Sequence, residues 1–154
     1  MGPYAFTRLT PDDLPLIRDW LGRPHVAEWW PAGAGEIEQV VAECDGEDAE
    51  TVPYLVHLQG RPVGYLQCTR EPSGLRSIDQ FIGEAELLNR GHGSALIGQF
   101  CDLLFAHSVP AVTTDPDPAN ARAIRAYEKA GFRPIGPRDT PWGHVLLMQK
   151  ENAS

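Results

Sequence analysis

The chain has 154 residues, 42% of them hydrophobic and 22% charged, a balance typical of one globular domain. Its formal net charge of -8 disfavours nucleic acid as a partner, because phosphates need a basic surface, but is compatible with a cationic ligand. No apolar run is long enough to cross a membrane and the N-terminus lacks a secretory pattern, so we expect a cytoplasmic protein. The three cysteines, Cys44, Cys68 and Cys101, lie outside any metal-binding spacing, so we expect reduced thiols and no metal site.

Hydrophobic periodicity predicts strands alternating with helices along the chain. The predicted strands are Tyr4–Leu9, Val52–Leu58, Pro62–Thr69, Arg76–Gly83, Ala111–Asp115 and two within Phe132–Gln149. The predicted helices are one that follows Thr10 and includes Leu14, Ile17 and Leu21, then Glu36–Cys44, Gly93–His107 and Ala119–Ala130. We therefore expect a single α/β (α+β) domain over residues 1–154, with strands and helices packed in layers.

Two helix ends carry clear signals. Thr10 is a favourable N-cap, Pro11 suits the first helical position, and Asp12 and Asp13 complement the helix dipole. Gly131 stands where a residue in the left-handed conformation would end the helix Ala119–Ala130.

A glycine-rich turn, Asn89-Arg90-Gly91-His92-Gly93-Ser94, separates a predicted strand from a predicted helix. Glycines let backbone N–H groups approach a ligand closely, and the helix N-terminus adds a positive dipole, so the turn suits a pyrophosphate. The turn is too short for a P-loop and lacks the GxGxxG order of a dinucleotide site. Taken alone, the motif is equally compatible with a plain tight turn.

A second motif follows further along the chain. The segment from Asn120 to Phe132, Asn-Ala-Arg-Ala-Ile-Arg-Ala-Tyr-Glu-Lys-Ala-Gly-Phe, resembles the late helix of the GCN5-related N-acetyltransferase (GNAT) superfamily. Ala123 and Tyr127 are four residues apart, hence on one helical face. The pair of motifs is more specific than either alone. The resemblance implies the GNAT fold, a mixed and mostly antiparallel twisted sheet of about seven strands with about four helices, and acetyl-CoA as cofactor.

The resemblance also implies which residues contact the coenzyme. The amides of the turn would bind the pyrophosphate, Asn120 would bind the pantetheine arm or an ordered water, and Tyr127 would protonate the departing thiolate. The full set of implied coenzyme contacts is Phe81, Ile82, Arg90, Gly91, His92, Gly93, Ser94, Asn120, Ala123 and Tyr127. For Tyr127 the alternative is a core aromatic with a surface hydroxyl. Leu88 departs from the family, which usually has Gln or Arg there, so one pyrophosphate contact is missing or supplied otherwise.

The acceptor amine must lose a proton before it attacks a thioester, so the site needs a group that binds the cation and takes its proton. Asp79, in the predicted strand Arg76–Gly83, suits both tasks. An ordinary aspartate has a pKa near 4, which is low for a base, so burial or electrostatic coupling would assist. The alternative is an exposed strand carboxylate, although charged residues in a central strand are disfavoured.

Further motifs resemble one branch of the superfamily, the aminoglycoside 6'-N-acetyltransferases. They are His25-Val26-Ala27-Glu28-Trp29-Trp30, Gly64-Tyr65-Leu66-Gln67, Ile78-Asp79-Gln80 and Thr114-Asp115-Pro116, and the resemblance extends over roughly Thr7 to Met148. It implies that Asp79 binds the reactive amine and acts as base, and that Asp115 holds a second ammonium group. Glu28, Trp29 and Gln67 would line the substrate side. We expect one of Trp29 and Trp30 only to pack in the core, and His25 to be structural.

This chain departs from that branch in one loop. The best-known members carry a longer acidic loop with a tryptophan between the two central strands, whereas this chain has only Cys68 to Ser77, with Glu71 as its sole carboxylate. The expected cleft is more open, and its amine recognition weaker, broader or different. The expected partner is a cationic small-molecule amine, and we expect binding to neither nucleic acid nor membranes. We expect the protein to be a monomer or a homodimer.

Two other functions remain open. One is acylation of a lysine-type amine in siderophore biosynthesis, although that branch usually has a histidine where Asp79 stands. The other is a non-catalytic CoA-binding or sensor module, which the joint presence of Asp79, Asn120 and Tyr127 disfavours.

Overall fold

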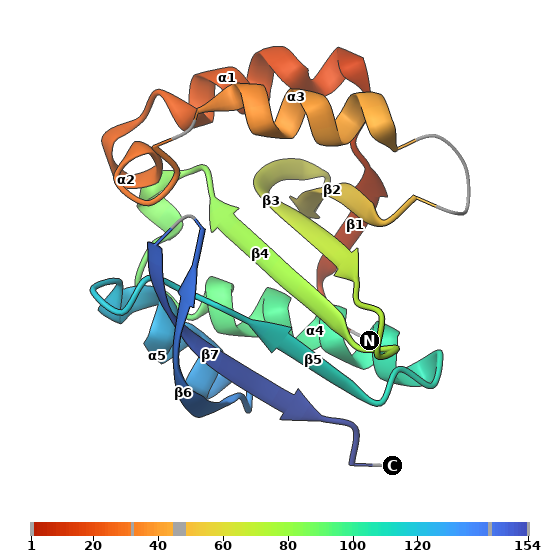
Figure 1. The fold of residues 1–154 in the computed structure, drawn as a ribbon. Coiled ribbons are helices and arrows are strands. Elements are labelled where there is room, and N and C mark those ends of the chain that lie inside the picture. The colour runs from red at the N-terminus through yellow and green to blue at the C-terminus, as the bar shows by residue number, and fades with distance from the viewer. Residues whose placement is uncertain (1, 32, 45–48, 142, 154) are drawn as a thin grey trace. The chain divides into compact units, whose positions relative to one another are not determined.

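The structure is a computed structural model that describes residues 2–31, 33–44, 49–141 and 143–153 (Figure 1). The strands are β1 (Tyr4–Arg8), β2 (Thr51–Leu58), β3 (Arg61–Arg70), β4 (Arg76–Ile82), β5 (Ala111–Thr114), β6 (Arg133–Thr140) and β7 (Gly143–Glu151). The helices are α1 (Leu14–Leu21), α2 (Pro24–Ala27), α3 (Ala34–Glu43), α4 (His92–Ala106) and α5 (Ala121–Lys129), with 3-10 turns at Pro11–Asp13 and Ala85–Leu87.

The predicted elements are confirmed with small shifts at their ends. The sequence did not predict α2, because a helix of one turn is too short to show a helical period. The turn predicted at Thr140–Gly143 includes residue 142, which lies outside the described residues, but Thr140 and Gly143 pair across it.

The seven strands follow the order β1-β2-β3-β4-β5-β7-β6. The pairs β1/β2, β2/β3, β5/β7 and β6/β7 are antiparallel, whereas β4 and β5 are parallel. This agrees with the predicted mixed, mostly antiparallel sheet. The chain divides into two compact units. The N-terminal unit comprises residues 3–69 and 80–87, the C-terminal unit Gly2 and residues 70–79 and 88–153, so each takes part of β4. That all 154 residues form one domain stays a prediction.

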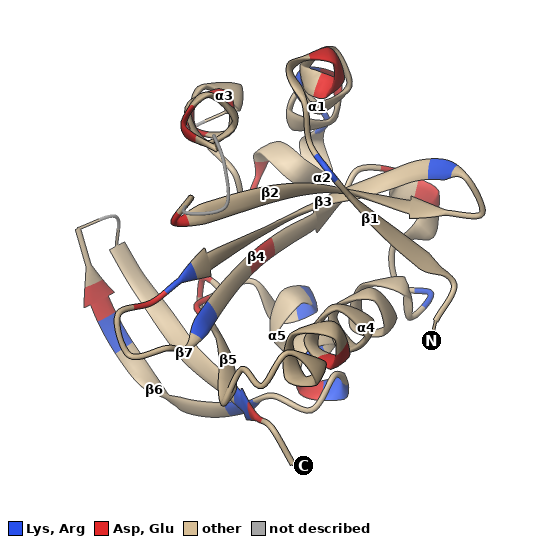
Figure 2. Cartoon of the chain, turned by 90° about the vertical axis from the view of Figure 1, so that its right-hand side faces the viewer, with Lys and Arg blue, Asp and Glu red and all other residues tan. Residues whose placement is uncertain are grey.

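In the N-terminal unit, α1 and α3 lie side by side over one face of β1, β2 and β3 (Figures 1 and 2). The apolar stripes of both helices are buried against the sheet, as their amphipathic sequences predict. The core there consists of Leu9, Ile17, Trp20, Leu21, Val26, Ile37, Leu55, Tyr65 and Phe81. At the start of the first helix, the backbone N–H of Thr10 donates to Asp13 Oδ2 at 2.9 Å, which confirms the predicted cap at Thr10.

The end of β4 is fixed to the N-terminal helices by polar contacts. Trp20 Nε1 donates to Glu84 Oε1 at 3.2 Å, while Arg23 donates to the Gly83 carbonyl oxygen and to Glu84 Oε2, both at 2.9 Å. These bonds hold the first residues after β4 against α1, and so position the end of the strand.

In the C-terminal unit, α4 and α5 pack against each other, and β6 and β7 form an antiparallel hairpin. The end of α5 has the predicted form. Gly131 has φ +102°, its N–H donates to the Glu128 carbonyl, and the Phe132 N–H donates to the Tyr127 carbonyl. These are the two bonds of a Schellman motif, and Phe132 then packs edge-on to Tyr127 with ring centroids 5.3 Å apart.

We predict that Gly64→Ala destabilises the protein by about 1–3 kcal/mol, the usual cost of overpacking. A Cβ at Gly64 would lie 2.6 Å from the carbonyl oxygen of Phe81, and backbone cannot move aside cheaply. Urea unfolding measures the effect. The control is Gly35→Ala within α3, where a Cβ meets nothing within 4 Å and should stabilise by about 0.5–1 kcal/mol. Equal stability of the two variants would contradict the prediction.

Candidate active site

The predicted glycine turn forms the N-terminus of α4. Gly91 is the N-cap residue with φ +83° and ψ 0°, and Asn89 before it has φ +60°. The bond from the Ala95 N–H to the Gly91 carbonyl is the first of the helix, so the amides of the first turn have no carbonyl partner within it. A Cβ at Gly91 would meet nothing within 4 Å, so the approach to these amides from that side is open. A helix N-terminus with its positive dipole fits the pyrophosphate of acetyl-CoA.

The side chains around this turn differ in what they can add. Arg90 is exposed and carries a positive charge suited to a phosphate, and His92 is half-buried at the first helical position. Ser94 does not offer its hydroxyl proton outward, because its Oγ donates to the Gly91 carbonyl at 3.2 Å. Leu88 is apolar and half-buried, so it adds no hydrogen bond to a pyrophosphate.

Asn120 has a structural role that the motif alone did not reveal. It is the N-cap of α5, and its Oδ1 accepts from the backbone N–H of Ala123 at 3.2 Å. Its Nδ2 group is left for another acceptor, so the same side chain can cap the helix and bind the pantetheine arm. Tyr127, one turn after Ala123, is only 3% exposed and packs on Phe132. Its burial is consistent with both interpretations of the sequence, the general acid and the core aromatic.

The two predicted substrate carboxylates follow the parallel pairing of β4 with β5. Ser77 pairs with Thr113, and Thr114 Oγ1 donates to the Ile78 carbonyl at 2.9 Å. Because side chains alternate along a strand, Asp79 lies on the same face of β4 as Ser77. Asp115 follows directly after the last residue of β5, two residues beyond Thr113. Figure 2 shows the acidic segment part-way along β4. Asp79 is half-buried there, which disagrees with the alternative of an exposed strand carboxylate.

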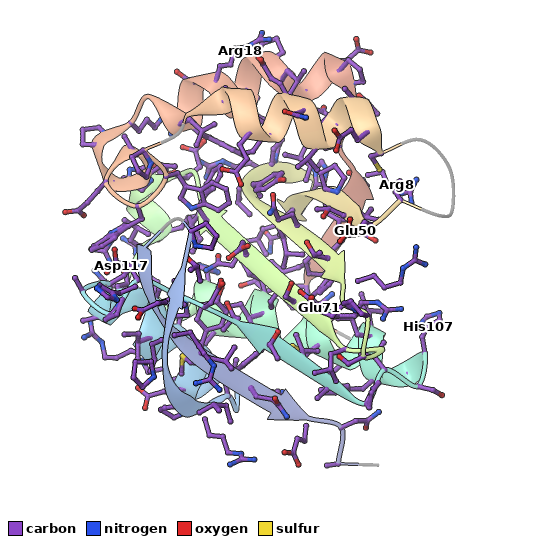
Figure 3. All side chains as sticks on the ribbon, in the orientation of Figure 1. Arg8, Arg18, Glu50, Glu71, His107 and Asp117 are labelled. Carbon is purple, nitrogen blue, oxygen red and sulfur yellow. The ribbon has the colours of Figure 1, made fainter. Side chains whose placement is uncertain are left out.

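A third carboxylate lies on that face. Ser77 Oγ donates to Glu71 Oε1 at 2.9 Å, which turns Glu71 from the short loop toward the β4 residues (Figure 3). Partial desolvation by the surrounding chain raises the pKa of Asp115, a hydrogen bond from its own backbone opposes the rise, and the negative charge of Glu71 adds to it. Asp115 still has an exposed surface, so solvent weakens these effects. The shortened loop thus keeps one carboxylate close to Asp115.

The other predicted substrate residues belong to the N-terminal unit. Glu28 is exposed at the end of α2, and Trp29 is half-buried outside the core cluster. Trp30 instead packs edge-on against Tyr65 and Phe81, with centroids 5.9 and 5.3 Å away, so it is the tryptophan that packs in the core. Gln67 is 8% exposed, and its Oε1 accepts from the Tyr65 hydroxyl at 2.7 Å.

The structure at the end of β4 shows which groups of Phe81 and Ile82 are available for the predicted coenzyme contacts. The Phe81 ring is 7% exposed and belongs to the aromatic core, so a coenzyme contact at Phe81 has to use its main chain. The carbonyl of Ile82 lies 3.0 Å from His25 Nε2, so one main-chain group of Ile82 already has a partner. This bond also gives His25 the structural role that the sequence favoured.

The structure draws attention to two residues that the sequence showed only as parts of motifs. Gln80 Oε1 is the one buried side-chain oxygen or nitrogen without a hydrogen-bond partner in the described part of the chain. Its place beside Asp79 was visible in the sequence, but its burial was not. Tyr65 appeared in the sequence only as part of a motif, and its bond to Gln67 required the strand geometry.

Residues 10–140 match the family model described as an acetyltransferase (GNAT) domain. The chain belongs to the GNAT acetyltransferase family. It is 36% identical over 159 aligned positions to the aminoglycoside N(6')-acetyltransferase type 1 of Klebsiella pneumoniae, covering 91% of this chain and 79% of the relative. It is 28% identical to the lysine N-acyltransferase MbtK of Mycolicibacterium paratuberculosis, covering 90% and 69%.

Solved structures agree with this assignment. A crystal structure of the aminoglycoside acetyltransferase AAC(6')-Ib in complex with coenzyme A and kanamycin aligns with a TM-score of 0.85 and 34% identity, covering 96% of this chain and 94% of that one. The resemblance inferred from the motifs is confirmed, and so are the GNAT fold and acetyl-CoA as the cofactor. None of the described helices is both long and apolar enough to cross a membrane.

We predict that Glu71→Gln lowers the pKa of Asp115 toward that of an ordinary aspartate, because it removes a neighbouring negative charge. Carboxyl carbon NMR titration measures the pKa, and high salt should reduce the difference from wild type. The control is Asp102→Asn, which removes an exposed charge on α4 that does not contribute to the shift. An unchanged pKa in Glu71→Gln would show that the two carboxylates do not interact.

A second prediction separates the two roles of Asn120. Asn120→Ser keeps a side-chain cap and should leave stability within about 0.5 kcal/mol, whereas Asn120→Ala should cost about 1 kcal/mol. Both variants lack the Nδ2 donor, so the KM for acetyl-CoA should rise about 3- to 10-fold in each, as for one lost hydrogen bond. If KM stays at the wild-type value in both, Asn120 only caps the helix.

Proposed function

We propose that this protein transfers an acetyl group from acetyl-CoA to the 6'-amine of an aminoglycoside, as an acyltransferase of the antibiotic-resistance type. The observation that carries the proposal is that Asp79 on β4 and Asp115, directly after β5, each lie two residues beyond the paired residues Ser77 and Thr113, with Glu71 close by. Several carboxylates suit a polycationic sugar. The similarity to the Klebsiella pneumoniae 6'-N-acetyltransferase supports this substrate class.

In the proposed reaction, the amine binds as its ammonium ion and passes a proton to Asp79, directly or through water. The free amine attacks the thioester carbonyl and forms a tetrahedral intermediate. Its collapse makes the amide and expels the thiolate of coenzyme A, which takes a proton from Tyr127. The amide nitrogen gives its extra proton to water, and exchange with water then reprotonates Tyr127 and removes the proton from Asp79. Because Asp79 is half-buried on a sheet strand, its carboxylate has little freedom to move away from the reacting amine.

The remaining residues bind the two reactants. The amides at the start of α4 and the charge of Arg90 hold the pyrophosphate, while Asn120 and Ala123 at the start of α5 face the pantetheine arm. The other proposed coenzyme contacts are Phe81, Ile82, Gly91, His92, Gly93 and Ser94. Asp115 binds a second ammonium group, and Glu28, Trp29 and Gln67 contact the sugar rings.

We place the enzyme in the cytoplasm, where acetyl-CoA is made and used, as a monomer or homodimer.

A lysine-type amine is the second candidate substrate, favoured by the similarity to the lysine N-acyltransferase MbtK. A lysine side chain, however, carries a single ammonium group, so it would leave Asp115 without an ammonium group to bind. The carboxylates Glu71, Asp79 and Asp115 therefore favour the substrate with several amines.

The test is release of coenzyme A thiol from acetyl-CoA in the presence of each amine. Wild-type protein should turn over kanamycin-type aminoglycosides with a 6'-amine and should not turn over analogues with a 6'-hydroxyl. Turnover of a lysine derivative without turnover of any aminoglycoside would identify a lysine-type amine as the substrate. Binding of acetyl-CoA without turnover of any amine would indicate a sensor module.

For the mechanism, we expect Asp79→Asn to lower kcat by about 10²- to 10⁴-fold, the usual contribution of a general base. The variant should bind acetyl-CoA with nearly wild-type affinity, as measured by calorimetry, because the turn that holds the pyrophosphate is intact. Asp102→Asn on α4 is the matched charge-removing control and should keep its kcat. A near-normal kcat for Asp79→Asn across the pH range would exclude Asp79 as the base.

A further inference from the structure

We propose that Tyr65 is a positioning residue, which holds the amide of Gln67 in one orientation so that Gln67 Nε2 donates a hydrogen bond to a hydroxyl or ether oxygen of the amine substrate. The proposal rests on the proposed function and assigns a specificity role within the same reaction. It concerns two residues on β3 of the N-terminal unit.

The contact between the two side chains is direct. The Tyr65 hydroxyl donates to Gln67 Oε1 at 2.7 Å, and the two side chains are 0% and 8% exposed. They are two residues apart on one strand, so both project from the same face of β3. A short bond between buried groups orders a side chain more firmly than the same bond in water, because no solvent competes for it.

Tyr65 itself is held by the aromatic core. Its ring stacks on Phe81 with centroids 5.5 Å apart and an interplanar angle of 28°, and Trp30 meets it edge-on at 5.9 Å. A ring that packs against both Phe81 and Trp30 cannot rotate without disrupting the core. The hydroxyl therefore has a fixed position, and it fixes the position of the Gln67 oxygen in turn.

The bond determines where the donors of Gln67 point. A glutamine amide has one oxygen acceptor and one nitrogen with two donors, so an amide whose oxygen faces Tyr65 directs its N–H groups away from that hydroxyl. Within the described residues, Gln67 Nε2 has no recorded hydrogen-bond partner. The Gln67 residue as a whole is only 8% exposed, so little solvent competes for these N–H groups, and an acceptor atom of a ligand would satisfy them.

Because Gln67 Nε2 is a hydrogen-bond donor, it can bind only those substrate atoms that accept hydrogen bonds. An ammonium group has no acceptor, so Nε2 cannot hydrogen-bond to it. Hydroxyl, ring and glycosidic oxygens all accept. Gln67 thus recognises the oxygens of an amino sugar, and a lysine-type amine without such oxygens does not use this contact.

The experiment compares steady-state kinetics of wild type, Tyr65→Phe, Gln67→Met and the double variant with a kanamycin-type aminoglycoside. Tyr65→Phe keeps the ring and removes only the hydroxyl, which lets the amide of Gln67 rotate. We expect the amine KM to rise about 3- to 10-fold, as for one hydrogen bond, with kcat and the KM for acetyl-CoA unchanged. Gln67→Met should raise the amine KM at least as much, and adding Tyr65→Phe to it should raise it no further.

Tyr4→Phe on β1 is the matched control, because it removes another buried tyrosine hydroxyl of the same unit and should leave every kinetic constant unchanged. The proposal is overturned if Tyr65→Phe lowers the melting temperature without changing the amine KM, or if its effect on KM persists in the Gln67→Met background. If Gln67→Met does not fold, the amine KM of Tyr65→Phe alone decides. Failure of wild type to turn over any aminoglycoside would reject the proposed function instead, so the two failures are distinguishable.

Discussion

The parallel pairing of β4 with β5 is the constraint on which the proposed chemistry depends. The pairs β1/β2, β2/β3, β5/β7 and β6/β7 are antiparallel, whereas β4 and β5 run in the same direction, with Ser77 beside Thr113. The buried bond from Thr114 to the Ile78 carbonyl locks this pairing. In this register, Asp79 on β4 and Asp115, directly after β5, each lie two residues beyond the paired Ser77 and Thr113. A slip of one residue in either strand would change which residues of the two strands lie side by side.

The starts of α4 and α5 show how structural and binding roles share the same groups. A helix N-terminus always leaves amides without internal partners, and something must satisfy them. At α5 the chain supplies the partner itself, through Asn120 Oδ1. At α4 the N-cap is Gly91, which has no side chain to offer as a cap, and this helix end is the one that we propose to bind the diphosphate of the coenzyme. An asparagine at the N-cap position closes a helix end with its own side chain, whereas a glycine there does not.

The aromatic core of the N-terminal unit has a comparable double role. Trp30, Tyr65 and Phe81 pack on one another, and this contributes to the stability of the fold. The rigid position of Tyr65 then orients Gln67 at its edge. Glu71 provides a similar case in the C-terminal unit, where a hydrogen bond from Ser77 turns the carboxylate of a short loop toward the β4 face. In both cases the side chain proposed to touch substrate is held by a neighbour that does not.

The sequence alone determined the order of the elements, the caps at Thr10 and Gly131, the glycine turn and the family, because each depends on residues close together in the chain. The sequence also singled out Asp79, Asp115 and Asn120, but gave each one role. Tertiary structure decided the rest. The register between strands far apart in sequence aligned the segments that lead to Asp79 and Asp115, and packing assigned Trp30 to the core. Hydrogen bonds then gave Tyr65 and Glu71 their partners, which depend on strand and loop geometry that the sequence pattern does not encode. The cap of Asn120 on Ala123 is local, and the preference of asparagine for the N-cap position could have predicted it.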